Sequence, residues 1–187
     1  MRRFFHLLAG FFLVLLAMHP LASLADRPIA VDAARIEKAD DGYRLVASFS
    51  LDLPHGLEET LHRGIPLYFT TELEISRPRW YWFDAKPVVA ARTIRIAYNV
   101  LTRRYSATVI GSLQQNINSL EEALNLIRHP QHWVFADRKR LTEGETYSAA
   151  IRLQLDMSYL PKPFQINVID NSNWRLSSDW KRFSFRA

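Results

Sequence analysis

The chain has 187 residues, a formal net charge of +5 and no cysteine. Without cysteine it can form no disulfide and carry no lipid on an N-terminal cysteine, so the fold must depend on its hydrophobic core. The net charge is modest, and we expect no nucleic-acid partner.

The N-terminus has the three parts of a secretory signal peptide. Arg2 and Arg3 precede an apolar run over residues 4–17, and Ser23-Leu24-Ala25 fits a cleavage site before Asp26. The run is shorter than the roughly 20 residues that span a bilayer, and an uncleaved N-terminal anchor is the alternative. We expect residues 1–25 to be a cleaved signal peptide. Residues 26–187 would then form one exported globular domain in the periplasm or cell envelope that does not span the membrane.

Alternation of apolar and polar residues predicts that strands dominate the exported part. Residues 29–38 and 43–53 flank the turn Asp40-Asp41-Gly42 and are expected to form a hairpin. One apolar and one polar face is typical of antiparallel sheets with one solvated side. Further strands are expected at residues 67–75, 94–100, 105–109, 147–155, 164–168 and 183–185.

Two short helices interrupt the strands. One is expected from Leu57 to Arg63, closed by Gly64. The other begins at Ser119, which forms a capping box with Glu122, and ends at His129-Pro130. Both helices are too short to be stable alone and must dock on a sheet.

The order strand, strand, helix, strand occurs twice. Tyr105 stands 62 residues after Tyr43, and a Leu-Glu-Glu helix follows each of these strands. A duplication explains the repeat, and chance similarity of amphipathic helices is the alternative. The expected fold class is α+β, mainly antiparallel β, with about eight strands in a sandwich or open barrel and two short helices packed on the sheet.

The densest concentration of aromatic residues is the segment 77–84, Arg-Pro-Arg-Trp-Tyr-Trp-Phe-Asp. Adjacent residues of a strand point to opposite faces, so these aromatic rings cannot all enter one core. Exposed aromatic residues beside arginine are typical of partner-binding surfaces, whereas a covering element would make the segment ordinary core. The candidate binding residues are Arg77, Arg79, Trp80, Tyr81 and Trp82.

Motifs for catalysis or metal binding are not apparent. His129 and His132 share a loop, but they lack a nearby cysteine or acidic partner for zinc. Asp84 and Asp156 would form a carboxylate pair only if the fold brought them together. The chain has no nucleophile elbow, no helical His-Glu-x-x-His and no glycine-rich phosphate loop. We therefore expect no enzymatic activity, no metal and no cofactor.

Several stretches together resemble an uncharacterised family of exported proteobacterial proteins, the domain of unknown function 4390, also described as proline-rich signal peptide proteins. The resemblance covers nearly the whole exported part and implies export, but no activity and no site residues. The stretches are Leu51-Asp52-Leu53, Gly64-Ile65-Pro66-Leu67, Arg79-Trp80-Tyr81-Trp82, Ser119-Leu120-Glu121-Glu122-Ala123-Leu124 and Leu155-Asp156-Met157-Ser158-Tyr159-Leu160-Pro161-Lys162-Pro163-Phe164-Gln165.

The expected function is a non-enzymatic partner-binding or accessory module that recognises an envelope or membrane protein. The alternative is a periplasmic carrier for a small apolar or anionic ligand. A cavity of a few hundred cubic ångströms would favour the carrier. A flat exposed aromatic patch would favour the partner-binding module.

Overall fold

The computed structural model describes residues 29–77, 85–130, 133–162, 165 and 175–187. Within these ranges the chain forms nine strands, two α-helices and two short 3-10 turns. The strands are β1 (Ile29–Ala39), β2 (Gly42–Leu51), β3 (Leu67–Arg77), β4 (Ala85–Asn99), β5 (Arg104–Val109), β6 (Gln115–Ile117), β7 (Trp133–Ala136), β8 (Thr146–Leu155) and β9 (Lys181–Arg186). The helices are α2 (His55–His62) and α3 (Leu120–Arg128), and the 3-10 turns are Arg138–Arg140 and Met157–Tyr159.

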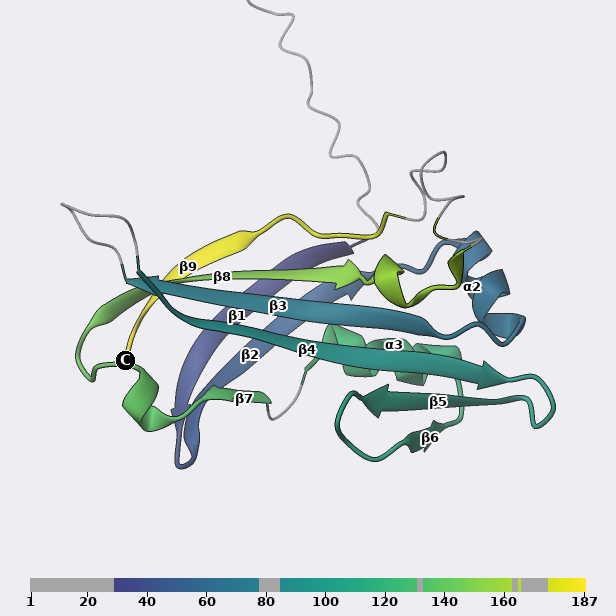
Figure 1. Ribbon diagram of the computed structural model, residues 1–187, viewed down its shortest axis with the longest axis horizontal. Helices are drawn as coiled ribbons and strands as arrows, with labels where there is room; N and C mark the ends of the chain where they lie inside the picture. The colour runs from purple at the N-terminus through teal and green to yellow at the C-terminus, as the bar shows by residue number, and fades with distance from the viewer. Residues whose placement is uncertain (1–28, 78–84, 131–132, 163–164, 166–174) are drawn as a thin grey trace, which may run out of the picture.

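The strands form two antiparallel sheets, which confirms the expected mainly antiparallel α+β class. The smaller sheet has the order β1-β2-β7, and the larger has the order β6-β5-β4-β3-β8-β9. The strands β1 and β2 of the smaller sheet run obliquely to β3, β4 and β8 of the larger sheet (Figure 1), and β1 contacts β8 and β9. Both sheets are open, so the arrangement is a two-layer sandwich and not a closed barrel.

The core lies between the two sheets and follows the predicted alternation. In β3, Leu67, Phe69, Leu73 and Ile75 are at most 1% exposed and share the inner face with the buried Thr71, while the residues at even-numbered positions face the other side of the sheet. Tyr43, Leu45, Phe49 and Leu51 of β2 and Ile151 and Leu153 of β8 complete the same layer. Burial of these side chains is the main stabilising contribution in a chain without disulfides.

The hairpin of β1 and β2 is confirmed, with Lys38 aligned with Tyr43 across the turn. Gly42 is necessary here for two reasons. Its φ of 150° is rarely adopted by residues with a side chain, and a Cβ atom would lie 2.2 Å from the carbonyl oxygen of Ala136 in β7. The close approach of β7 therefore depends on glycine at position 42.

Both predicted helices are present and dock as expected. The Ser119 hydroxyl accepts a hydrogen bond from the Glu122 amide at 3.1 Å, and the Glu122 carboxylate accepts one from the Asn118 amide. Helix α3 packs against β2 and β5, whereas α2 packs against β4. Helix α3 therefore bridges the β1–β2 hairpin and the strands β5 and β6, whereas α2 contacts β4. The duplication stays a prediction.

The structure also contains elements that the alternation did not predict. Strands β6 and β7 have only three and four residues, too few for a period-2 pattern. Strand β4 begins at Ala85, nine residues before the expected start at Ile94. Of the strand expected at 164–168, only Gln165 is described, and its amide donates to the Pro161 carbonyl as in a helical turn.

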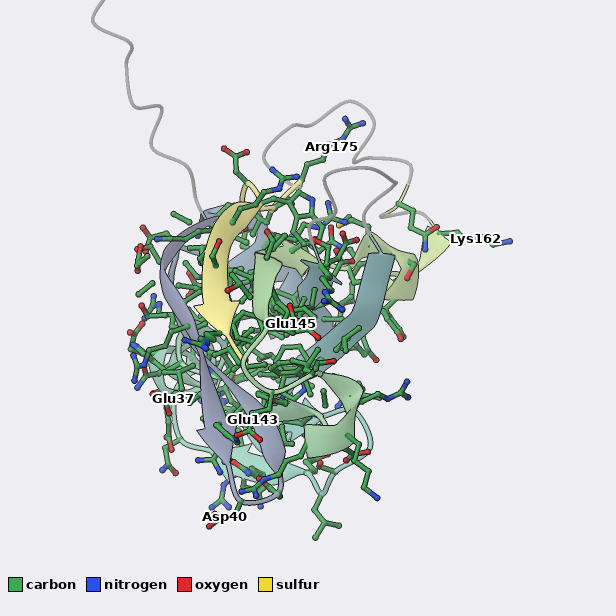
Figure 2. All side chains as sticks on the ribbon, turned by 90° about the vertical axis from the view of Figure 1, so that its left-hand side faces the viewer. Glu37, Asp40, Glu143, Glu145, Lys162 and Arg175 are labelled. Atoms are coloured by element: carbon green, nitrogen blue, oxygen red, sulfur yellow. The ribbon has the colours of Figure 1, made fainter. Side chains whose placement is uncertain are left out.

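Hydrogen bonds and ion pairs tie the two layers together at their edges. The Lys181 ammonium donates to the Val31 and Asp32 carbonyls of β1, where β1 bulges. At the end of the sandwich shown in Figure 2, Lys38 of the smaller sheet contacts Glu143 at 2.5 Å. This exposed pair lowers the pKa of Glu143, first through the hydrogen bond from Lys38 and then through its charge.

Candidate functional site

The most distinctive side chain on the inner face of the larger sheet is an arginine. Arg92 of β4 is aligned with the buried Thr71 of β3 and precedes Ile94 and Ile96 on the same face. These two isoleucines are 5% and 0% exposed, so a charged residue here interrupts a strictly apolar row. A guanidinium on such a face costs desolvation energy unless polar groups or a ligand interact with it.

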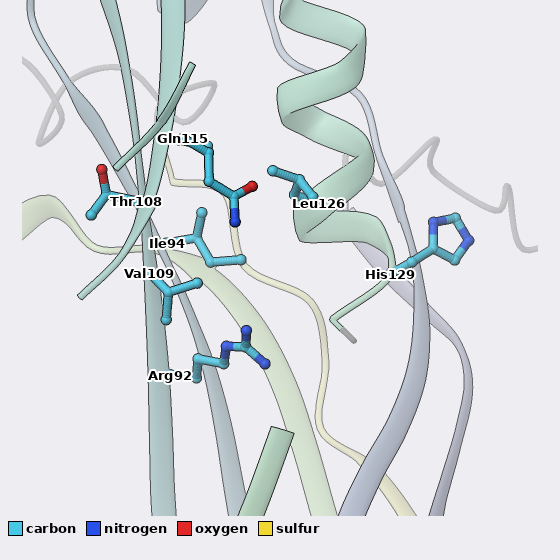
Figure 3. Close-up of a pocket in the computed structure, with 8 residues that line it drawn as sticks. Arg92, Ile94, Thr108, Val109, Gln115, Leu126 and His129 are labelled. Atoms are coloured by element: carbon cyan, nitrogen blue, oxygen red, sulfur yellow. The ribbon is translucent and has the colours of Figure 1, made fainter. Parts of the chain in front are cut away.

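Arg92 lines a pocket of about 340 Å³ between the larger sheet and the C-terminal end of α3. Figure 3 shows Arg92 and Gln115 extending from the strands towards the space beside Leu126, while the His129 ring lies on the far side of the helix end. The hydroxyl of Thr108 points away from this space. The complete lining is Arg92, Ile94, Ala107, Thr108, Val109, Gln115, Leu126 and His129.

The lining combines one cation and the polar side chains of Gln115 and His129 with apolar residues. Burial lowers the pKa of Arg92 from its usual value, because the surroundings disfavour the charged form. Ile94, Ala107 and Val109 supply an apolar floor, and Leu126, 36% exposed, supplies a wall from α3. The guanidinium fork binds carboxylates and phosphates in two-point geometry. The site is therefore suited to a small molecule with an apolar body and an anionic group.

Only one of the binding residues expected from the sequence can be placed. Arg77, at the end of β3, forms an ion pair with Glu145 at 2.9 Å, and its side chain is 40% exposed. Arg79, Trp80, Tyr81 and Trp82 lie outside the described residues, so the exposure of the aromatic segment stays a prediction. Arg77 is not among the residues that line the pocket.

Of the histidines and acids singled out from the sequence as candidates, His129 and Asp156 lie in the described part of the chain, where each contacts a near neighbour in the sequence. His129 is exposed and contacts the Asn125 side chain at 2.8 Å, while His132 lies outside the described ranges. Asp156 accepts hydrogen bonds from Ser158, and Asp84 is not described. Within the described part of the chain, no three histidine or acidic residues gather closely enough to hold a metal ion.

A second cluster lies where α2 meets the strands. The His62 ring nitrogen Nε2 is 2.6 Å from the Tyr105 hydroxyl, and Tyr98 packs against both rings. Burial, reinforced by Tyr98 and Glu58, raises the pKa of Tyr105. His62 is exposed, so the cluster stabilises the docking of α2 rather than forming an enclosed site.

The sequence analysis did not identify Arg92, although a signal was present. Extending the alternation of Ile94 and Ile96 backwards places position 92 on the inner face, where arginine is out of place. Nothing in the sequence marks Gln115 or Leu126 in this way. They line the pocket because the fold places β6 and α3 beside it.

Within the described ranges no helix is long and apolar enough to cross a membrane. No protein with a curated description and no solved structure matches the chain. The sequence model of one family, described as Domain of unknown function (DUF4390), matches residues 26–184, most of the chain. The chain therefore belongs to this family of unknown function.

Proposed function

We propose that this protein is a non-catalytic binding protein for a small amphipathic anion. The observation that carries the proposal is the inward-facing Arg92 beside apolar walls in the 340 Å³ pocket. The volume falls within the range of small-molecule sites, which are mostly apolar with a few convergent polar groups. The pocket supports the carrier alternative. The aromatic segment lies outside the described residues, so the partner-binding surface stays a prediction.

Export of the protein is part of this proposal. The family match begins at residue 26, the first residue after the cleavage site expected from Ser23-Leu24-Ala25. This coincidence supports a processed domain in the periplasm or cell envelope. In that compartment the pocket would hold a ligand such as a fatty acid or another carboxylate with an apolar tail.

Calorimetric titration of the domain with decanoate tests the proposal. Arg92→Met keeps the length and apolar body of the side chain but removes the guanidinium. Hydrogen bonds to charged groups contribute about 1.5–3 kcal/mol. The Kd for decanoate should therefore rise about tenfold or more. Decanol should bind the wild-type protein more weakly than decanoate does.

Arg95→Met provides the matched control. Arg95 lies in the same strand, but it aligns with Tyr68 and Thr108 on the outer face. This variant should bind decanoate like the wild type. Equal affinity of Arg92→Met and wild type, with both folded by circular dichroism, would contradict the assigned role of Arg92.

A further inference from the structure

The turn between β4 and β5 exposes two neighbouring apolar side chains at one end of the molecule. Leu101 is 95% exposed and Val100 is 54% exposed, although leucine and valine are usually buried. Figure 1 shows the turn projecting from the end of the larger sheet, on the side where α2 packs on β4. Both side chains can therefore enter an apolar medium without any rearrangement of the sandwich.

Hydrogen bonds within the turn fix its shape. The Asn99 side-chain oxygen accepts hydrogen bonds from the amides of Leu101 and Thr102, each at 3.0 Å. Arg103 has a φ of 54° and is the only residue other than glycine with a positive φ in the described ranges. Glycine or asparagine adopts this left-handed conformation with less strain, so arginine at this position indicates a use for its guanidinium.

Two arginines flank the apolar side chains of the turn. Arg103 follows Thr102 directly, and Arg104 is aligned with Asn99 at the base of the turn. Both arginines are exposed, and neither forms an ion pair with another residue of the described ranges. Their guanidinium groups are therefore free to bind an anionic partner, and guanidinium binds phosphate in two-point geometry.

Helix α2 adds charges of both signs beside the turn. A Cβ atom on Gly64 would lie 3.4 Å from Val100, so the preceding Arg63 also lies near the turn. Arg63 is 3.9 Å from the Glu59 carboxylate, in a pair whose side chains are both more than half exposed. This pair leaves Arg103 and Arg104 as the source of positive charge at the turn itself.

Aromatic side chains with polar ends lie behind the turn. Tyr98 and Tyr105 are aligned across β4 and β5, with ring centroids 4.8 Å apart, and the His62 ring packs edge-on against Tyr98. Tyrosine is enriched where proteins meet the membrane–water interface, because its ring is apolar and its hydroxyl is polar. From the tip inwards, the order is thus apolar, cationic and aromatic.

We propose that the β4–β5 turn docks the protein on the surface of a membrane that contains anionic lipids. Val100 and Leu101 enter the boundary of the acyl chains, while Arg103 and Arg104 bind the lipid phosphates. A fluid bilayer receives a protruding turn without a preformed groove. A stable protein–protein contact buries a far larger area than two apolar side chains provide. This interaction goes beyond the small-ligand function and does not rest on it, because the turn shares no residue with the pocket.

Co-sedimentation with lipid vesicles tests the proposal on the protein recovered from the periplasm. The probes are vesicles of equal parts phosphatidylglycerol and phosphatidylcholine, and vesicles of phosphatidylcholine alone. The protein should bind the anionic vesicles more tightly, and added salt should weaken this binding by screening the attraction between arginine and phosphate. Failure to bind the anionic vesicles would overturn the proposal.

The apolar contribution is tested with two leucine variants. Leu101→Gln should weaken binding to the anionic vesicles about tenfold, because the variant places a polar group at the tip. Leu113→Gln is the matched control, since Leu113 is 90% exposed but lies in the loop between β5 and β6, at the other end of β5. This control should bind like the wild type. Equal binding by Leu101→Gln and wild type would overturn the proposal.

The cationic contribution is tested with two double variants of equal charge. Arg103→Gln combined with Arg104→Gln should weaken binding to the anionic vesicles about tenfold or more. Lys139→Gln combined with Arg140→Gln removes the same charge from exposed positions in the 3-10 turn between β7 and β8, at the opposite end of the molecule (Figure 1), and should bind like the wild type. Equal losses in the two double variants would mean that net charge, and not the turn, attracts the protein to the membrane.

Insertion can be followed directly, because the chain has no cysteine. An environment-sensitive fluorophore on Leu101→Cys should shift its emission to the blue with anionic vesicles, and quenchers in the acyl chains should reduce it. The same label on Leu113→Cys should not respond. Equal responses at the two positions would contradict insertion of the turn.

Two other occupants of the turn would give different results. A dimer that Leu101→Gln separates, detected by light scattering, would overturn the proposal in favour of a second copy. A photo-crosslinker at position 101 that joins a protein but no lipid in intact cells would overturn it in favour of a protein partner. Leu101→Gln should bind decanoate like the wild type, so failure of the membrane proposal leaves the small-ligand function standing.

Discussion

Arg92 is the charged residue that distinguishes the pocket beside α3 from the apolar core around it. It follows Ala90 and precedes the buried Ile94 on the inner face of β4, and its own side chain is half-buried. Arginine is the cation best suited to such a position, since its guanidinium is more weakly hydrated than an ammonium.

Alanine substitutions at two glycines distinguish the stability cost of overpacking from the cost of backbone strain. Gly111→Ala introduces a Cβ with no atom within 4 Å, so only the positive φ of 89° should cost stability, about 1–2 kcal/mol. Gly42→Ala also has a positive φ and forces a Cβ against the Ala136 carbonyl, which adds an overpacking cost of about 1–3 kcal/mol. Urea unfolding should therefore rank Gly42→Ala as clearly less stable than Gly111→Ala. Equal losses would mean that β7 moves away from position 42 without cost.

At the scale of elements, a strand could be predicted from the sequence when its alternation of apolar and polar residues was long and regular. Strand β3 alternates over its full length, so its inner and outer faces could be assigned in advance. The first half of β4 reads Ala-Lys-Pro-Val-Val-Ala-Ala-Arg and contains no alternation of apolar and polar residues. Among the described strands, only β3 pairs with this half. The pocket could not be predicted, because it depends on where β5 ends relative to α3.

The hydrogen bond that caps the start of α3 leads to a prediction about stability. The Ser119 hydroxyl accepts the Glu122 amide hydrogen bond, and Ser119→Ala removes the acceptor and leaves a helix-terminal N–H without its cap. The expected loss is about 1 kcal/mol of unfolding free energy. Ser184→Ala, at an exposed position in β9, should stay within about 0.5 kcal/mol of wild type. Indistinguishable stabilities for the two variants would count against the contribution of the cap.

At the scale of the whole molecule, two open sheets are held together by their shared core and by helix α3. Helix α3 covers β2 and β5 from one end, and Lys181 joins β9 to the carbonyls of β1. The two layers leave the first half of β4 without a second neighbour among the described strands. The pocket and this unpaired side of β4 are therefore adjacent consequences of one feature, the early end of β5.

The last prediction concerns how the whole chain is processed. Arg2 and Arg3, the apolar run over residues 4–17 and Ser23-Leu24-Ala25 together predict cleavage between Ala25 and Asp26. Intact mass and N-terminal sequencing of protein recovered from the periplasm should give a product that begins at Asp26. Ala25→Gln places a bulky polar residue directly before the cleavage site and should leave the precursor unprocessed, whereas Ala22→Gln lies outside the two small positions and should be cleaved normally. Recovery of wild-type protein that still begins at Met1 would favour the uncleaved anchor, with the β sandwich tethered at the membrane surface.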